Sequence, residues 1–152
     1  MSDIIDSEGG LVDKFIGDGI MAIFLSSASD VDHALRAVRA AVAMQNAVDE
    51  AKEKWSALHS SIVNLEVRVG INSGEMVAGN IGSQSRMEYT VIGDNVNVAS
   101  RIESNGQEGR VMISEATYHR VKNYGVNATR LQAINVKNRR QPVQIYCVES
   151  LG

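Results

Sequence analysis

Cysteine and long apolar runs are what this sequence most clearly lacks. Its 152 residues include one cysteine, Cys147, which excludes an intrachain disulfide, and no Cys/His group has zinc-site spacing. No apolar run approaches the length of a membrane span, and Met1 is followed by polar residues rather than by a signal peptide. These absences predict a cytoplasmic protein with no membrane segment in this chain.

An excess of charge of either sign is also absent. The 15 Lys and Arg residues against 18 Asp and Glu residues leave a net charge of -3, which gives no general attraction to nucleic acid or anionic lipid. Any anion-binding site must therefore be a local cluster of cations. With 44% apolar and 22% charged residues, and a length that suits one core, the chain is expected to form a single domain over residues 1–152.

The first part of the chain predicts a β-hairpin followed by an amphipathic helix. Two apolar runs in 11–25 flank Gly17-Asp18-Gly19, a sequence that favours a tight turn. Ser29 and Asp32 can start a helix that continues to about His59. Its apolar face, spaced by four and three residues, consists of Ala37, Ala41, Met44, Val48, Ala51 and Trp55.

The rest of the chain mixes short strands with short helices. Strands are predicted over 65–71, 76–78, 89–92, 111–113, 129–136 and 143–148, and helices over 95–103 and 115–122. Pro142, the only proline, falls in the turn before the last strand, where its missing N–H does no harm. The interspersed elements predict an α+β fold, a mixed sheet with helices on one face.

Three long segments resemble the catalytic domain of class III adenylate and guanylate cyclases. They are GGLVDKFIGDGIMAIF (9–24), VRVGINSGEMVAGNIGS (67–83) and MEYTVIGDNVNVASRIE (87–103), and the tail VKNRRQPVQIY (136–146) fits less closely. A lone GDG would carry no weight, so the resemblance rests on their shared order and spacing. It is most like a bacterial-type adenylate cyclase and implies a ferredoxin-like α+β fold.

The resemblance also implies a reaction. The family closes the ribose 3′-oxygen of a nucleoside triphosphate onto its own α-phosphate and releases pyrophosphate. Two divalent metal ions, Mg²⁺ or Mn²⁺, assist, and the site lies at a head-to-tail dimer interface. ATP is the ligand that the resemblance implies for this chain.

By resemblance, Asp18 binds metal, while Lys14 and Thr90 contact the purine. The ordinary alternative for Asp18 is an aspartate that only stabilises the turn, and for Lys14 it is a solvated lysine on a strand. Hard divalent ions accept carboxylate oxygens, which suits Asp18. Adenine offers an acceptor at N1 and a donor at N6, whereas a lysine only donates and a threonine hydroxyl can accept. Guanine would call for an acidic residue at the place of Lys14, so the pair favours ATP over GTP.

Asn97 and Arg101 lie four residues apart, so they share one face of the predicted helix. A solvated polar face is the alternative. In the family's NVNVASR pattern the asparagine orients the ribose and the arginine stabilises transition-state charge on the α-phosphate. Lys137 corresponds to a lysine that holds the terminal phosphates. The family usually has a glycine after this lysine, whereas this sequence has Asn138 and then two arginines. The alternative interpretation of Lys137 is a lysine in a charged surface loop.

The family has a strand and two helices before the segment that begins here, and they carry its second metal-binding aspartate. Asp3 and Asp6 do not match that position, because DIIDSEGG resembles the end of the helix before Gly9-Gly10. We therefore expect weak or no activity of this chain alone, and exposed edges that favour an oligomer, most simply a dimer. Three functions stay open: adenylate cyclase, guanylate cyclase, and an inactive module that binds nucleotide or a partner.

Overall fold

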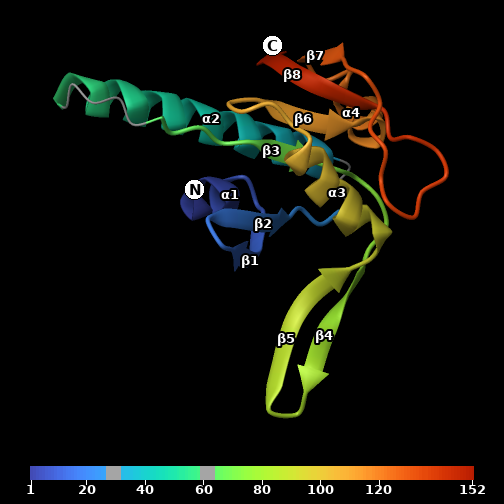
Figure 1. The fold of residues 1–152 in the computed structure, drawn as a ribbon. Helices are drawn as coiled ribbons and strands as arrows, with labels where there is room; N and C mark the ends of the chain where they lie inside the picture. Colours follow the sequence, from blue (N-terminus) through green and yellow to red (C-terminus); the bar gives the residue numbers. More distant parts are fainter. Residues whose placement is uncertain (27–31, 59–63) are drawn as a thin grey trace.

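The computed structural model describes residues 1–26, 32–58 and 64–152, without the side chains of Ile81 and residues 86–90 (Figure 1). The elements, in chain order, are α1 (Ser2–Ser7), β1 (Leu11–Ile16), β2 (Gly19–Ile23), α2 (His33–Leu58), β3 (Val69–Ile71), β4 (Val77–Ser83), β5 (Arg86–Ile92), α3 (Asp94–Ser104), β6 (Val111–Ser114), α4 (Glu115–Val121), β7 (Val126–Arg130) and β8 (Ile145–Leu151). None of the described helices combines the length and the apolar character that crossing a membrane requires.

A four-stranded mixed sheet organises the molecule. Its strand order is β3-β6-β8-β7, with β3 parallel to β6, and with β6 and β7 both antiparallel to β8. The predicted α+β class with a mixed sheet is therefore confirmed. The helices at 95–103 and 115–122 are confirmed as α3 and α4 within one residue at each end.

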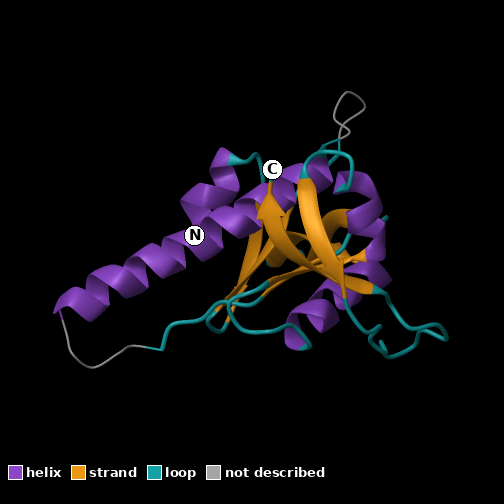
Figure 2. Ribbon diagram, turned by 90° about the horizontal axis from the view of Figure 1, so that it is seen from above, coloured by secondary structure: helices purple, strands orange, loops and turns teal. Residues whose placement is uncertain are grey.

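Alternating side chains of the sheet contribute to two cores, and helices lie on both sides of the strands (Figure 2). On one face Val111 and Ile113 pack with α2 and with Val121 of α4. On the other face Met112 packs with Val98 and Ile102 of α3. The structure corrects the expectation of helices on one face: α2 and α4 cover one face and α3 covers the other. Because strand side chains alternate, both faces of the sheet can bury apolar residues.

The described part also contains two hairpins. The first, β1–β2, is the hairpin predicted over 11–25, and its strands close from Leu11↔Ile23 to Ile16↔Gly19. The second, β4–β5, pairs from Val77↔Ile92 to Ser83↔Arg86 and projects away from the sheet (Figure 1). Its strands are longer than the predicted 76–78 and 89–92, because the partner strand supplies hydrogen bonds that no local pattern shows.

Several predicted strand boundaries are wrong for a related reason. The strand predicted over 65–71 shortens to β3, because pairing with β6 begins only at Val69↔Val111. The strand predicted over 129–136 lies instead at Val126–Arg130, as β7, which pairs with β8. The second half of the predicted range forms only an isolated bridge, Ile134↔Val143. The last strand runs over Ile145–Leu151 rather than 143–148.

The predicted helix after the first hairpin is α2. Ser29 and His59, at its expected ends, lie outside the described residues, and the helix runs from His33 to Leu58. Ala37, Ala41 and Val48 of the predicted apolar face are buried. Trp55 is instead 56% exposed, because the last turns of α2 extend beyond the sheet (Figure 1).

Candidate active site

Asp18 occupies the tip of the first hairpin. Ile16 pairs with Gly19, so Gly17 and Asp18 form a two-residue turn, and Gly17 takes the positive φ (59°) that such turns require. Asp18 is exposed, so its carboxylate is accessible to a ligand. Its place at the tip, predicted from the two flanking glycines, is confirmed.

Lys14 lies beside a β-bulge in β1. Val12 pairs with Ala22 and Lys14 with Met21, so Asp13 is the extra residue of the bulge. The Nζ of Lys14 is 3.6 Å from Oδ2 of Asp13, whose side chain is 2% exposed against 45% for Lys14. The lysine thus keeps an exposed ammonium group with a buried carboxylate beside it.

Arg36 of α2 anchors both ends of this hairpin. Its Nη1 donates to the carbonyl oxygens of Glu8 (3.3 Å) and Gly9 (3.0 Å), and its Nη2 donates to that of Leu25 (3.0 Å). Gly9 has φ of 73°, and a Cβ there would lie 2.8 Å from Nη1 of Arg36. One guanidinium therefore ties the segments before β1 and after β2 to the helix.

Thr90 lies in β5, opposite Gly79 of β4, and its side chain is outside the described part of the structure. Strand β5 contacts β1, so the strands that carry Thr90 and Lys14 are neighbours. Strand β5 also leads directly into α3 through Gly93, which has φ of 143°. The chain therefore brings the elements of the proposed base contact and of Asn97 next to one another.

Asn97 and Arg101 are both exposed on α3, as the four-residue spacing predicts. Their helix buries Val98 and Ile102 (1% and 0% exposed) on its opposite face. At Gly70 of β3 an added Cβ would lie 2.4 Å from the backbone nitrogen of Glu103, so α3 rests directly on the sheet backbone. Close packing on one side orients the polar pair on the other.

Lys137 is exposed in the loop that joins β7 to β8. Asn138 has φ of 68°, the only positive value among the described non-glycine residues. Asparagine adopts this left-handed conformation more readily than most residues. The loop therefore keeps a glycine-like backbone at the position where the sequence departs from the family pattern.

The loop after Lys137 meets the start of α3. Arg139 places Nε and Nη2 each 2.6 Å from Oδ2 of Asp94, the first residue of α3. Of the basic residues in the loop, Arg139 is thus engaged in an ion pair. No local signal in the sequence could have paired Arg139 with a residue 45 positions away.

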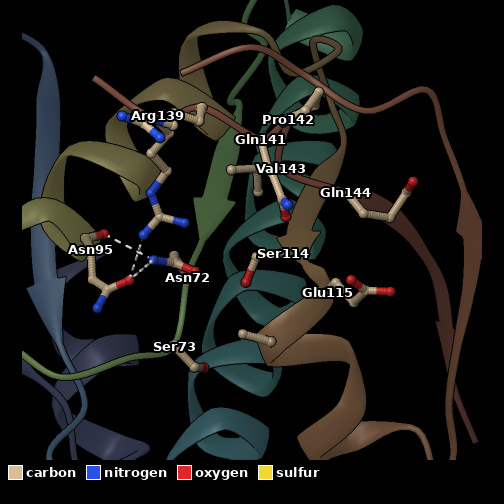
Figure 3. A pocket seen from close by; sticks show the side chains of 12 residues that line it. Asn72, Ser73, Asn95, Ser114, Glu115, Arg139, Gln141, Pro142, Val143 and Gln144 are labelled. Atoms are coloured by element: carbon tan, nitrogen blue, oxygen red, sulfur yellow. Dashed lines mark hydrogen bonds between the residues drawn. The ribbon is translucent and has the colours of Figure 1, made fainter. Parts of the chain in front are cut away.

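A pocket of about 470 Å³ opens beside this contact (Figure 3). Asn72 and Asn95 form one wall, and loop residues 139–144 form another. Ser73 and Ser114 line it too, and both hydroxyl groups lie within hydrogen-bonding distance of Thr117 Oγ1, at 2.9 and 3.2 Å. The pocket is polar, and its hydroxyl groups are already partnered.

Among the predicted site residues whose side chains the structure describes, no hydrogen bond or ion pair joins any two; these are Lys14, Asp18, Asn97, Arg101 and Lys137. The fold instead brings together the elements on which these residues lie. Strand β1 contacts β5, and Arg139 links the loop that contains Lys137 to α3. Asp18 is linked to the rest only through its hairpin. The predicted site residues therefore lie on several separate elements of the chain.

Metal ligands are the least complete part of this site. In the segments that the structure describes, no three His, Cys, Asp or Glu side chains gather as a metal site would require. Asp18 contributes one carboxylate, and Mg²⁺ in nucleotide sites is usually held by one or two carboxylates together with phosphate oxygens and waters. The described residues do not form a metal centre by themselves.

Comparison with known proteins identifies the family. The family model for the adenylate and guanylate cyclase catalytic domain matches residues 1–150, so the chain belongs to this family. An adenylate cyclase of Anabaena cylindrica is 36% identical over 156 residues, 99% of this chain and 30% of the relative. The chain spans between 7% and 30% of the length of the first curated relatives it matches.

Solved structures give the same family with two specificities. The adenylyl cyclase CyaB from P. aeruginosa superposes with a TM-score of 0.89 at 38% identity, over 98% of this chain and 76% of that one. The guanylyl cyclase Cya2 superposes with a TM-score of 0.87 at 39% identity, over 99% and 75%. The nucleotide cyclase fold is therefore shown, and overall similarity does not separate ATP from GTP.

Proposed function

We propose that this chain forms part of an adenylate cyclase, which converts ATP to 3′,5′-cyclic AMP and pyrophosphate. Family membership supports the reaction class. The preference for ATP over GTP rests on Lys14. This residue is a hydrogen-bond donor on β1, which contacts β5, the strand that contains Thr90. A lysine ammonium complements the N1 acceptor of adenine, whereas it would face the N1–H donor of guanine.

The reacting groups are oriented by α3 and the neighbouring loop. We assign Asn97 to the ribose and Arg101 to the charge that develops on the α-phosphate, since a planar, permanently charged guanidinium suits a phosphate oxygen. Lys137 holds the terminal phosphates that leave as pyrophosphate. Within the described residues, the side chains of Asn97, Arg101 and Lys137 have no polar partner, so they are open to a ligand.

Mg²⁺ or Mn²⁺ is the proposed cofactor, two ions per site as in the family. Bound metal would stabilise the 3′-oxyanion and the leaving pyrophosphate. Asp18 is one proposed ligand, and the phosphate oxygens of the nucleotide would be others. The side chains of this chain bind and orient the nucleotide.

Assembly of the site is proposed to require a second copy. Large apolar side chains on the two hairpins are exposed: Leu11 (52%), Phe15 (67%), Ile16 (60%), Val77 (67%) and Ile92 (51%). Strands β1 and β5 contact each other, so the two hairpins that carry these exposed apolar side chains are neighbours. Apolar area of this kind favours association, and a homodimer would bring together the parts that one chain presents separately.

Cyclic nucleotide formation from ATP and from GTP, with Mn²⁺, tests the proposal on this chain and on the complete product of its gene. Cyclic AMP formation at a rate that exceeds cyclic GMP formation is the expected result for the complete product. A preference for GTP would contradict the base assignment. Nucleotide binding without turnover in the complete product would instead support the inactive module.

A further inference from the structure

We propose that Arg139 is a positioning residue that holds the Lys137 loop against the start of α3. The inference rests on the proposed function, because it concerns how Lys137 is set relative to Asn97 and Arg101. Its basis is the ion pair in which Nε and Nη2 of Arg139 both lie 2.6 Å from Oδ2 of Asp94. Asp94 begins the helix that carries the other two residues.

The helix start that receives Arg139 is itself fixed. Asn72 Nδ2 donates to the backbone oxygen (3.0 Å) and to Oδ1 (3.1 Å) of Asn95, and Asn95 Nδ2 donates to the carbonyl of Glu75 at 2.9 Å. Arg139 Nη2 also donates to Oδ1 of Asn95 at 3.4 Å (Figure 3). The side chain of Asn95 therefore connects the start of α3 with the segment after β3 and with the loop between β7 and β8. The first turn of α3 is a firm support for the loop.

The loop has few other supports. Between β7 and β8 it rejoins the sheet through the bridge Ile134↔Val143, and Val136 and Val143 are buried at its base. Beyond that base residues 137–141 are exposed. In this exposed stretch Arg139 is the only described side chain with a hydrogen bond or ion pair to the rest of the chain, so the position of Lys137 depends on it.

This arrangement separates the roles of the three cations in the loop. The guanidinium of Arg139 is engaged by Asp94, whereas Lys137 and Arg140 have no polar side-chain partner within the described residues. The paired side chains are 35% and 53% exposed, and exposed ion pairs contribute little to folding stability. Loss of Arg139 is therefore expected to change catalytic geometry while the fold persists.

The test compares single and exchanged charges in the complete gene product with ATP as substrate. Arg139→Gln and Asp94→Asn should each lower kcat by about 10- to 100-fold, with a smaller change in KM, because small displacements of reacting groups cost this much. The double exchange Arg139→Asp with Asp94→Arg should recover part of the loss. Arg140→Gln is the matched control and should stay within about twofold of the wild type.

Equal activity of Arg139→Gln and Arg140→Gln would overturn the inference, and so would an exchange variant no better than the single variants. Thermal unfolding of each variant separates a failed fold from misplaced groups. Lys137→Gln distinguishes this inference from the proposed function. If Lys137→Gln is active, the role of Lys137 and the inference both fail. If it is impaired and Arg139→Gln is not, only the inference fails.

Discussion

At the scale of single residues, base choice depends on which atoms donate and which accept. Lys14→Glu replaces a donor with an acceptor, so it should lower kcat/KM for ATP by about 10- to 100-fold, the value of a hydrogen bond to a charged group. The same change should raise the share of GTP turnover, because a carboxylate can accept from N1–H of guanine. Competition assays with both nucleotides measure the shift. Lys54→Glu, on the exposed surface of α2, is the control, and an equal change there would contradict the assignment.

Arg101 is the residue from which we expect the largest loss of rate. Arg101→Ala should lower kcat by about 10²–10³-fold, as removal of a transition-state contact does, with little change in unfolding temperature because the side chain is exposed. Initial rates of cyclic AMP formation and a thermal melt measure the two effects. Arg120→Ala, an exposed arginine on α4, is the matched control. Near-normal turnover in Arg101→Ala would disprove its role.

A pH-dependent contribution to stability is expected between the start of β6 and strand β8, the two central strands of the sheet. Nη2 of Arg110 lies 2.6 Å from Oε2 of Glu149, and this hydrogen bond holds the pKa of Glu149 below its ordinary value. A carboxyl group with a lowered folded-state pKa stabilises the fold above its unfolded-state pKa, and this contribution is lost as pH falls through the folded-state pKa.

Glu149→Gln should therefore be less stable than the wild type at neutral pH, and the difference should shrink as pH falls below the ordinary glutamate range, about 4.3. Urea unfolding midpoints at a series of pH values measure it. Glu108→Gln serves as a control, since Glu108 is exposed and, within the described residues, has no charged partner. A difference that stays constant with pH would exclude the ion pair as its cause.

At the scale of elements, the contact between α3 and β3 sets the face that Asn97 and Arg101 present. Gly70→Ala would place Cβ 2.4 Å from the nitrogen of Glu103 and 2.8 Å from the oxygen of Ala99, backbone atoms that cannot rotate away. We expect a loss of about 1–3 kcal/mol in the free energy of unfolding, with lower activity because α3 must shift. Chemical denaturation measures the loss.

Gly79→Ala is the matched control for this variant, because no atom lies within 4 Å of a Cβ added at this other strand glycine. It should leave the free energy of unfolding almost unchanged. Equal destabilisation by both substitutions would point to loss of backbone freedom in strands in general rather than to the packing of α3.

Element boundaries also show where sequence patterns lose their power. Helices α3 and α4 follow from local signals, such as the buried Ser114 that caps α4 by accepting from the backbone nitrogen of Thr117. The ends of β3 and β7 do not, because a strand ends where its neighbour ends. Likewise, the anchoring of the first hairpin by Arg36 involves backbone oxygens that no side-chain pattern reveals.

At the scale of the whole molecule, activity and association are expected to fall together. Phe15→Ser and Val77→Ser, each at a site 67% exposed, should weaken the dimer and lower cyclic AMP formation at low protein concentration. Sedimentation over a range of concentrations measures the dimer. Leu58→Ser is the control, because Leu58 is 77% exposed at the far end of α2 (Figure 1). A wild-type protein that stays monomeric at high concentration and is fully active would disprove the shared site.

The sequence by itself determined the residue types of the site and their local settings. Asp18 between two glycines, Asn97 and Arg101 four residues apart, and the NVNVASR run are local features, and local backbone preferences suffice to place them on a turn and on one helix face. Only the tertiary structure decided that Arg139 belongs to Asp94, that Asn138 takes a left-handed conformation, and that β4 and β5 form one long projecting hairpin. The physical reason is that these contacts join segments distant in sequence, whose pairing depends on packing and charge in three dimensions rather than on local pattern.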